Sequence, residues 1–151
     1  MTSSDELMMP IDPQWAEIRE GVRAICEQFP NEYWMKLDAA SEYPTEFVQA
    51  LTDGGYLGCL IPEEYGGSGL PLSAGCAVLE TIHEMGCNAA ACHAQMYTMG
   101  TVLKHGSEEQ KRKYLPEIAS GKLRLQAFGV TEPTTGSDTT QLKTRAEKRG
   151  N

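Results

Sequence analysis

The sequence has no long apolar run. No stretch of its 151 residues approaches the roughly 18 consecutive apolar residues that a membrane-spanning helix requires. The first nine residues, MTSSDELMM, contain two acidic residues and no basic one, which matches neither a secretory signal nor an arginine-rich transit peptide. These absences predict a cytoplasmic protein.

Basic residues are also scarce. The chain has 13 Lys and Arg against 21 Asp and Glu, which gives a formal net charge of −8. Binding to nucleic acid is driven by clustered positive charge on one surface. The short basic stretches at 111–113 and 143–149 are interpreted as solvated faces, and no nucleic-acid partner is expected.

The five cysteines form no CxxC pair and are odd in number, so a disulfide framework or structural zinc site is not predicted. Gly86 and Asn88 are typical of a helix end and a new cap, and they interrupt the one stretch rich in metal-ligand side chains. No metal site is therefore predicted for the members of that stretch, which are His83, Cys87, Cys92 and His93.

The spacing of apolar residues predicts five helices before Gly121. Apolar side chains recur at steps of three and four, and Pro, Asn or Gly marks most of the expected ends. Met96 and Met99 share one such stripe and are interpreted as core, with the lining of an apolar ligand site as the alternative. The expected helices cover 13–29 with Asp12 as cap, 44–54, 71–85, 88–106, and the residues after a capping box of Ser107 and Gln110.

After Gly121 the pattern changes to a period of two, which indicates strands. Apolar and polar residues alternate over 122–127 and again over 142–146. The fold class predicted is mainly α, with a helical domain over 1–121 and the opening strands of a truncated β-domain over 122–151. Two strands alone are marginal in water, so we expect them to fray or to be stabilised by a neighbouring molecule.

The stretch FGVTEPTTGSD, residues 128–138, has the composition of a ligand-holding turn. Gly136 permits close approach of a ligand, while Thr131, Thr135 and Ser137 offer hydroxyl and backbone N–H groups to a phosphate or a heterocycle. A plain strand-turn-strand connection capped by Asp138 explains the same residues. The glycine-rich loop 66–69 lacks the Lys-Ser/Thr ending of a phosphate-binding loop and is interpreted as a turn.

Four motifs occur in an order that resembles the acyl-CoA dehydrogenase family. Thr131-Glu132-Pro133 followed by Gly136-Ser137-Asp138 is similar to the flavin-binding signature TEPxxGSD of that family. The other three motifs are IPEEYGGSGL at 61–70, GSEEQK at 106–111, and YLP at 114–116 with ASG at 119–121. The resemblance extends from about Pro44 to Asn151.

The resemblance implies FAD as cofactor and an assembly of two or four subunits. Complete members have a helical N-terminal domain, a middle β-domain and a C-terminal four-helix bundle. Glu132 and Asp138 would be structural, and Phe128 stands where the family often has a hydroxylated aromatic residue. The residues implied to contact FAD are Phe128, Val130, Thr131, Gly136 and Ser137, and Ser137 would also touch the acyl-CoA substrate.

The implied reaction is oxidation of an acyl-CoA thioester to the trans-2-enoyl-CoA, with electrons passed to an electron-transfer flavoprotein. The glutamate that acts as base lies in the C-terminal bundle of the family, so no catalytic residue is assigned here and this chain alone is expected to be inactive. The alternatives are a related acyl-CoA oxidase or flavin monooxygenase, or a non-catalytic helical module that binds a partner protein.

Overall fold

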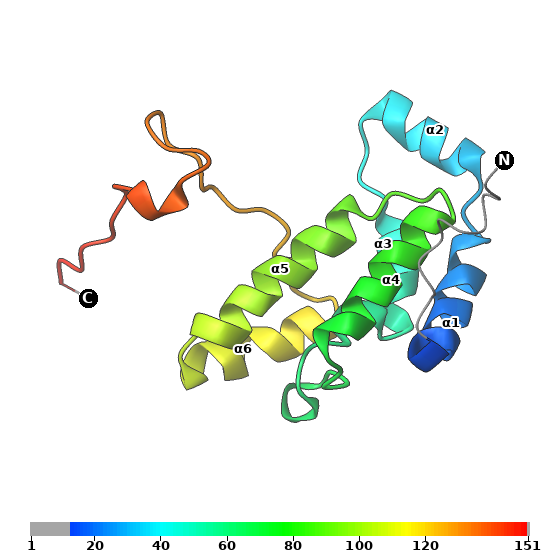
Figure 1. Ribbon diagram of the computed structural model, residues 1–151, viewed down its shortest axis with the longest axis horizontal. Coiled ribbons are helices and arrows are strands. Elements are labelled where there is room, and N and C mark those ends of the chain that lie inside the picture. Colours follow the sequence, from blue (N-terminus) through cyan, green and yellow to red (C-terminus); the bar gives the residue numbers. More distant parts are fainter. Residues whose placement is uncertain (1–12, 151) are drawn as a thin grey trace, which may run out of the picture.

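The computed structural model describes residues 13–150, which form a helical body and an extended C-terminal segment. Figure 1 shows the helices gathered together, while the residues after about 128 lead away from them. Helix α1 packs against α3 and α4, and α5 packs against α4 and α6. The helices are α1 (Ala16–Cys26), α2 (Asn31–Ala40), α3 (Thr45–Asp53), α4 (Leu72–Glu84), α5 (Ala90–His105) and α6 (Glu108–Ala119).

The first predicted helix is confirmed, although it begins and ends differently from the expectation. A short 3-10 helix at Pro13–Trp15 precedes α1, and α1 ends at Cys26. Two members of the predicted apolar stripe, Trp15 and Val22, are buried, and so is Cys26, which the stripe did not include. The expected cap, Asp12, lies outside the described residues.

Helix α2 was missed by the sequence prediction, which ended its first helix near Phe29 and left the next residues unassigned. No side chain of α2 is fully buried, so the sequence has no apolar stripe to indicate this helix. Aromatic contacts hold it instead: the Trp34 ring lies 4.8 Å from that of Phe47, and the Tyr33 ring 5.0 Å from that of Phe29, both edge to face.

The predicted helices at 44–54 and 71–85 are confirmed as α3 and α4. Helix α3 ends at Asp53, and Gly55 follows with a φ of 78°, a left-handed conformation that glycine adopts without steric cost. Helix α4 buries Val78 and Ile82. Both helices therefore begin directly after a proline and end beside glycine or in a short turn, as their sequences indicate.

The predicted helix at 88–106 is confirmed as α5, although its N-cap residue is Ala89 and not the expected Asn88. Asn88 stands one position earlier, and its Oδ1 accepts a hydrogen bond from the Ala90 N–H at 2.8 Å. The predicted capping box of α6 is also present. Ser107 Oγ accepts from the Gln110 N–H at 3.2 Å, and Gln110 Oε1 accepts from the Ser107 N–H at 2.8 Å.

The apolar core lies mainly among α1, α3, α4 and α5, with a second cluster between α5 and α6. Met96 belongs to the first cluster and Met99 to the second, and both are buried, which favours their interpretation as core residues. The largest side chains with almost no exposed surface in the first cluster are those of Phe47, Leu51, Leu57 and Ile82.

The glycine-rich loop at 66–69 folds back onto the preceding residues. A Cβ atom at Gly67 would stand 2.1 Å from the Ile61 carbonyl oxygen and 2.5 Å from that of Gly58. Only glycine allows this approach. The loop thus closes a tight structural turn, in agreement with the interpretation of its sequence.

The two predicted strands do not form within residues 13–150. Residues 123–127 and 142–146 have extended or irregular backbone, and the one β-bridge joins Glu132 to Thr135. A strand requires a neighbour that pairs with its backbone, and none lies beside either segment in this part of the chain. None of the described helices combines the length and apolar character needed to cross a membrane.

Candidate functional site

The residues singled out by sequence motif lie in one tight turn and its flanks. The Glu132 N–H donates to the Thr135 carbonyl oxygen at 2.9 Å, and the Thr135 N–H donates to the Glu132 carbonyl oxygen at 3.1 Å. Pro133, with its fixed φ, occupies the first of the two central positions of this turn. Thr135 is buried at the base of the turn, whereas Gly136 and Ser137 are exposed just after it.

The Glu132 carboxylate forms hydrogen bonds within the candidate site. It accepts from the Lys143 N–H at 2.9 Å and from the Thr144 N–H at 2.7 Å, and so ties the turn to the chain that returns past it. Hydrogen bonds from the Thr144 side chain and from these two N–H groups lower the pKa of the Glu132 carboxyl. Glu132 is thus ionised near neutral pH and acts as a structural clamp.

Asp138 caps the short 3-10 helix Thr139–Gln141. Its Oδ1 accepts from the Thr140 N–H at 3.2 Å and from the Thr140 hydroxyl. Bonds from the side chain and then the backbone of Thr140 lower the pKa of the Asp138 carboxyl. The sequence predicted that Asp138 caps the turn itself, whereas in the structure it caps the 3-10 helix that follows the turn. Both carboxylates of the motif have structural partners.

Acidification is expected to release the Glu132 clamp. Because the folded pKa is lowered, its bonds to Lys143 and Thr144 are present above the ordinary carboxyl pKa of 4.5 and are lost as pH falls through the lowered folded value. Amide ¹⁵N–¹H shifts of Lys143 and Thr144, followed by NMR from about pH 7 to about pH 2, should move together with a midpoint below the ordinary value. In Glu132→Gln this titration should vanish; a midpoint above 4.5, or its persistence in the variant, would contradict the clamp.

The groups that the turn leaves free are donors. No hydrogen bond to another described residue occupies the backbone N–H of Val130, Thr131, Gly136 or Ser137. A Cβ atom built on Gly136 meets only Thr131 Cγ2, at 3.9 Å, so the space beside that backbone is open. The turn can therefore offer N–H and hydroxyl donors to a ligand rich in acceptors, such as a phosphate or a flavin ring edge.

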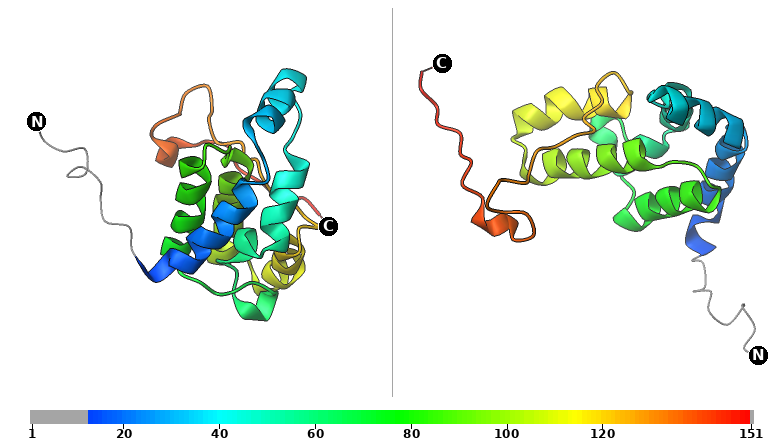
Figure 2. Two further views of the ribbon diagram at one scale, coloured as in Figure 1. Left: turned by 90° about the vertical axis from the view of Figure 1, so that its right-hand side faces the viewer. Right: turned by 90° about the horizontal axis from the view of Figure 1, so that it is seen from above.

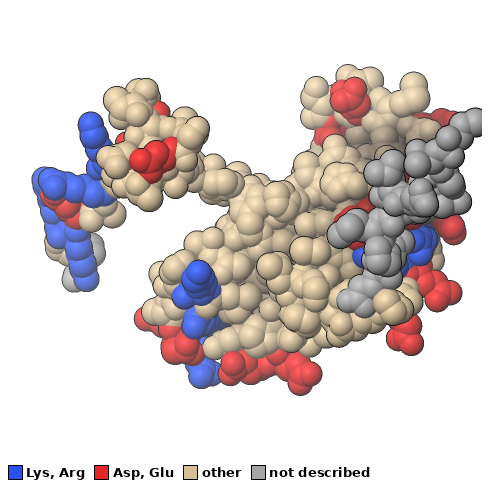
Figure 3. All heavy atoms as spheres, viewed as in Figure 1, with Lys and Arg blue, Asp and Glu red and all other residues tan. Residues whose placement is uncertain are grey.

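Phe128, the first residue of the predicted site, is exposed and lies against α5. The residue is 62% exposed. The centroid of its ring lies 4.8 Å from that of the Tyr97 ring, in an edge-to-face arrangement. Figure 3 shows few charged side chains on the visible surface between the C-terminal segment and the helical body, whereas Asp and Glu gather along the lower edge. The visible surface between the segment and the helical body is thus largely uncharged.

The sequence reasoning missed the side chains that hold the approach to the turn. Arg124 donates to Thr52 Oγ1 at 3.1 Å and to Gln49 Oε1 at 2.9 Å, both on α3. Gln126 Nε2 donates to Gln95 Oε1 at 3.3 Å on α5. The alternation over 122–127 predicted a strand, and it did not indicate that its polar side chains contact α3 and α5.

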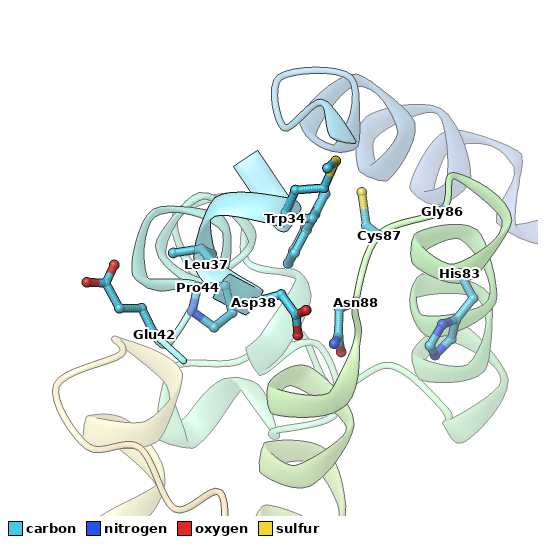
Figure 4. A pocket seen from close by; sticks show the side chains of 10 residues that line it. Trp34, Leu37, Asp38, Glu42, Pro44, His83, Gly86, Cys87 and Asn88 are labelled. Atoms are coloured by element: carbon cyan, nitrogen blue, oxygen red, sulfur yellow. The ribbon is translucent and has the colours of Figure 1, made fainter. Parts of the chain in front are cut away.

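A pocket lies elsewhere, between α2 and the link from α4 to α5. It has a volume of about 650 Å³. Figure 4 shows Trp34, Asp38 and Asn88 bordering its opening from the two sides. Within residues 13–150 no three His, Cys, Asp or Glu side chains are grouped to hold a metal ion, and the four candidate ligands of the sequence do not converge.

Comparison with known proteins identifies the family. The family model described as "Acyl-CoA dehydrogenase, N-terminal domain" matches residues 12–122. A probable acyl-CoA dehydrogenase of Mycobacterium bovis, fadE25, is 33% identical over 136 residues, which cover 89% of this chain and 34% of the relative. The chain thus spans about a third of the length of the curated relatives it matches.

Solved structures agree with the sequence comparison. The crystal structure of the prolyl acyl carrier protein oxidase AnaB superposes with a TM-score of 0.73 at 28% identity, covering 93% of this chain and 38% of that one. An acyl-CoA dehydrogenase from Bacillus anthracis, complexed with FAD, gives a TM-score of 0.70 at 28% identity and covers 95% of this chain and 25% of that one. With its helical body matched by the family model and by these structures, the chain belongs to the acyl-CoA dehydrogenase family.

Proposed function

We propose that this chain supplies one wall of an FAD site in a flavoenzyme that oxidises an acyl-CoA thioester to the trans-2-enoyl-CoA. The observation that carries the proposal is the set of free donors on the turn after Phe128, next to carboxylates that are already occupied. In this proposal residues 1–121 are the helical N-terminal domain, and residues 122–151 begin the flavin-binding domain.

Each proposed contact has a chemical reason. The free N–H groups of Val130 and Thr131 suit the polar edge of an isoalloxazine ring, and the exposed Phe128 side chain offers it an apolar surface. Gly136 and Ser137 suit the pyrophosphate, because the glycine leaves open space and the serine adds a hydroxyl donor. Ser137 would also contact the thioester end of the substrate.

The residues of this chain bind and orient, and FAD when bound supplies the redox chemistry. Glu132 and Asp138 keep the turn in shape through their hydrogen bonds to Lys143, Thr144 and Thr140. Neither is assigned to proton transfer, since a base must lie within hydrogen-bond reach of the substrate proton and both are committed to the turn. The glutamate base implied by the family has no counterpart in this chain.

The proposal includes partners. We propose an electron-transfer flavoprotein as the electron acceptor, an assembly of two or four subunits, and a cytoplasmic location. Acyl-CoA would approach the side of the turn that carries Ser137. These assignments rest on the family resemblance of the four ordered motifs.

The test is made on the product of the complete reading frame that contains this chain. We expect it to purify with bound FAD, or to bind FAD on reconstitution, and to reduce an artificial electron acceptor when an acyl-CoA is added. The isolated 151-residue chain should bind FAD weakly and show no such activity. A complete product that neither carries FAD nor can be reconstituted with it would refute the proposal.

A second candidate reaction is favoured by the likeness to the prolyl acyl carrier protein oxidase, whose structure superposes with a TM-score of 0.73. In that alternative, molecular oxygen accepts the electrons, and the acyl group is attached to an acyl carrier protein and not to coenzyme A. Oxygen uptake, measured with and without an artificial acceptor on acyl-CoA and on acyl carrier protein thioesters, separates the two reactions. Turnover that depends on the acceptor and not on oxygen supports the dehydrogenase.

A further inference from the structure

The segment 122–128, which forms neither helix nor strand, lies on the helical body, and the residues beyond it do not. Figure 1 and Figure 2 both show the chain leaving the helices after this segment. We propose that Tyr97 of α5 is a positioning residue for the flavin site, because it holds Phe128 at the point where the chain departs. This inference rests on the proposed function, in which Phe128 begins the flavin-contacting stretch.

The contact between Tyr97 and Phe128 joins the end of the segment to α5. The two rings lie 4.8 Å apart with an interplanar angle of 78°, an edge-to-face geometry that attracts beyond simple burial. His93 stands one helical turn before Tyr97, and its ring lies 5.1 Å from the tyrosine ring at 79°. The rings of His93, Tyr97 and Phe128 thus form a row that links α5 to the segment.

Gln126, two residues earlier, is anchored on the same helix. It accepts from the Tyr43 hydroxyl at 2.6 Å and donates to Gln95 Oε1 at 3.3 Å. Gln95 is fully buried, and its Nε2 has no hydrogen-bond partner among the described residues. Loss of the bond from Gln126 would leave the buried Gln95 side chain with an unsatisfied oxygen as well as an unsatisfied nitrogen. Breaking this bond therefore costs free energy.

Arg124 provides the third anchor through its bonds to Thr52 and Gln49 on α3. Alternate residues 124, 126 and 128 therefore contact the body in turn, while Leu123 and Leu125 pack against the cluster between α5 and α6. In an extended chain, a shift of one residue would place each of these two sets of side chains where the other set now makes its contacts. These anchors fix the register of the segment.

Gly129 follows directly and has open space beside its backbone. A Cβ atom built there would have no neighbour within 4 Å. The proposed flavin-contacting stretch therefore starts at a residue, Phe128, whose ring is in contact with α5. Removal of the Tyr97 ring should free Phe128 while Gln126 stays attached.

The test compares Tyr97→Ala, Tyr97→Phe and Lys104→Ala by ¹⁵N relaxation in the 151-residue chain. We expect the backbone order parameter of Phe128 to be near that of a rigid backbone, about 0.85, in the wild type, Tyr97→Phe and the exposed control Lys104→Ala. In Tyr97→Ala it should fall toward about 0.6 or below, with Gln126 unchanged. Unaltered amide shifts in α3 and α4 verify the fold, and Tyr97→Leu replaces the alanine variant if that one unfolds.

A second readout links the contact to the flavin. In the FAD-loaded complete protein, the visible absorption band of the flavin should shift in Tyr97→Ala and not in Tyr97→Phe or Lys104→Ala. An order parameter of Phe128 that is the same in Tyr97→Ala as in the wild type overturns the inference, and so does an unshifted band. The relaxation measurement needs no flavin. It therefore tests the contact between Tyr97 and Phe128 whether or not the protein binds FAD.

Discussion

Replacement of Phe47 by alanine is expected to destabilise the helical body by about 3–5 kcal/mol. Phe47 has no exposed surface, and its ring lies 5.2 Å from Phe29 and 4.8 Å from Trp34. The substitution removes a whole aromatic side chain from a site where α1, α2 and α3 meet, and the remaining cavity cannot close without moving these helices. Because domains of this kind are stable by only about 5–15 kcal/mol, the variant should be close to unfolding.

Urea unfolding followed by circular dichroism measures this loss. The matched control is Phe128→Ala, which removes the same atoms from an exposed position and should cost at most about 1.5 kcal/mol through its contact with Tyr97. Equal midpoints for the two variants would show that the aromatic cluster around Phe47 does not stabilise the body.

Replacement of Glu80 by alanine is expected to cost about 3 kcal/mol, which is large for a residue whose side chain is 65% exposed. Its carboxylate pairs with the Arg19 guanidinium, whose side chain is only 8% exposed, across the contact between α1 and α4. Without Glu80 the buried cation retains the Thr81 hydroxyl at 3.2 Å, while its Nε already has no partner among the described residues. An uncompensated buried charge accounts for the cost.

Two comparisons test this explanation. Glu84→Ala, one turn along the same helix, breaks the exposed pair with Arg23 and should cost no more than about 1 kcal/mol. Arg19→Met removes the buried charge itself and should cost less than Glu80→Ala. If Glu80→Ala and Glu84→Ala have the same free energy of unfolding in urea at neutral pH, Glu80 does not stabilise the buried guanidinium of Arg19.

The sequence was sufficient where one physical rule decided the local structure. Helices α3 to α6 have apolar stripes and prolines, glycines or polar caps at their ends, and they were predicted to within a few residues. Helix α2 has no stripe, because contacts between rings distant in sequence, such as Trp34 and Phe47, hold it. The period of two after Gly121 was real, but its alternate side chains contact helices instead of lining a sheet.

The candidate site was predictable in composition and not in geometry. The motif at 128–138 indicated a turn with donors, and the structure has a turn at 132–135. The aspartate expected to cap that turn caps the 3-10 helix after it. The clamp from Glu132 to residues 143 and 144 joins positions eleven and twelve residues apart, and no local pattern in the sequence indicates it. Likewise, the pairing of Tyr97 with Phe128 depends on how α5 lies beside the extended segment.

The measurement that tests the central claim most directly is a structure of the complete protein with FAD bound. The account predicts the polar edge of the flavin ring within hydrogen-bond distance of the Val130 and Thr131 N–H groups, and the pyrophosphate beside Gly136 and Ser137. Phe128 should border the ring while still in contact with Tyr97. A flavin bound elsewhere, with the turn at 131–138 in contact with none of its atoms, would contradict the account.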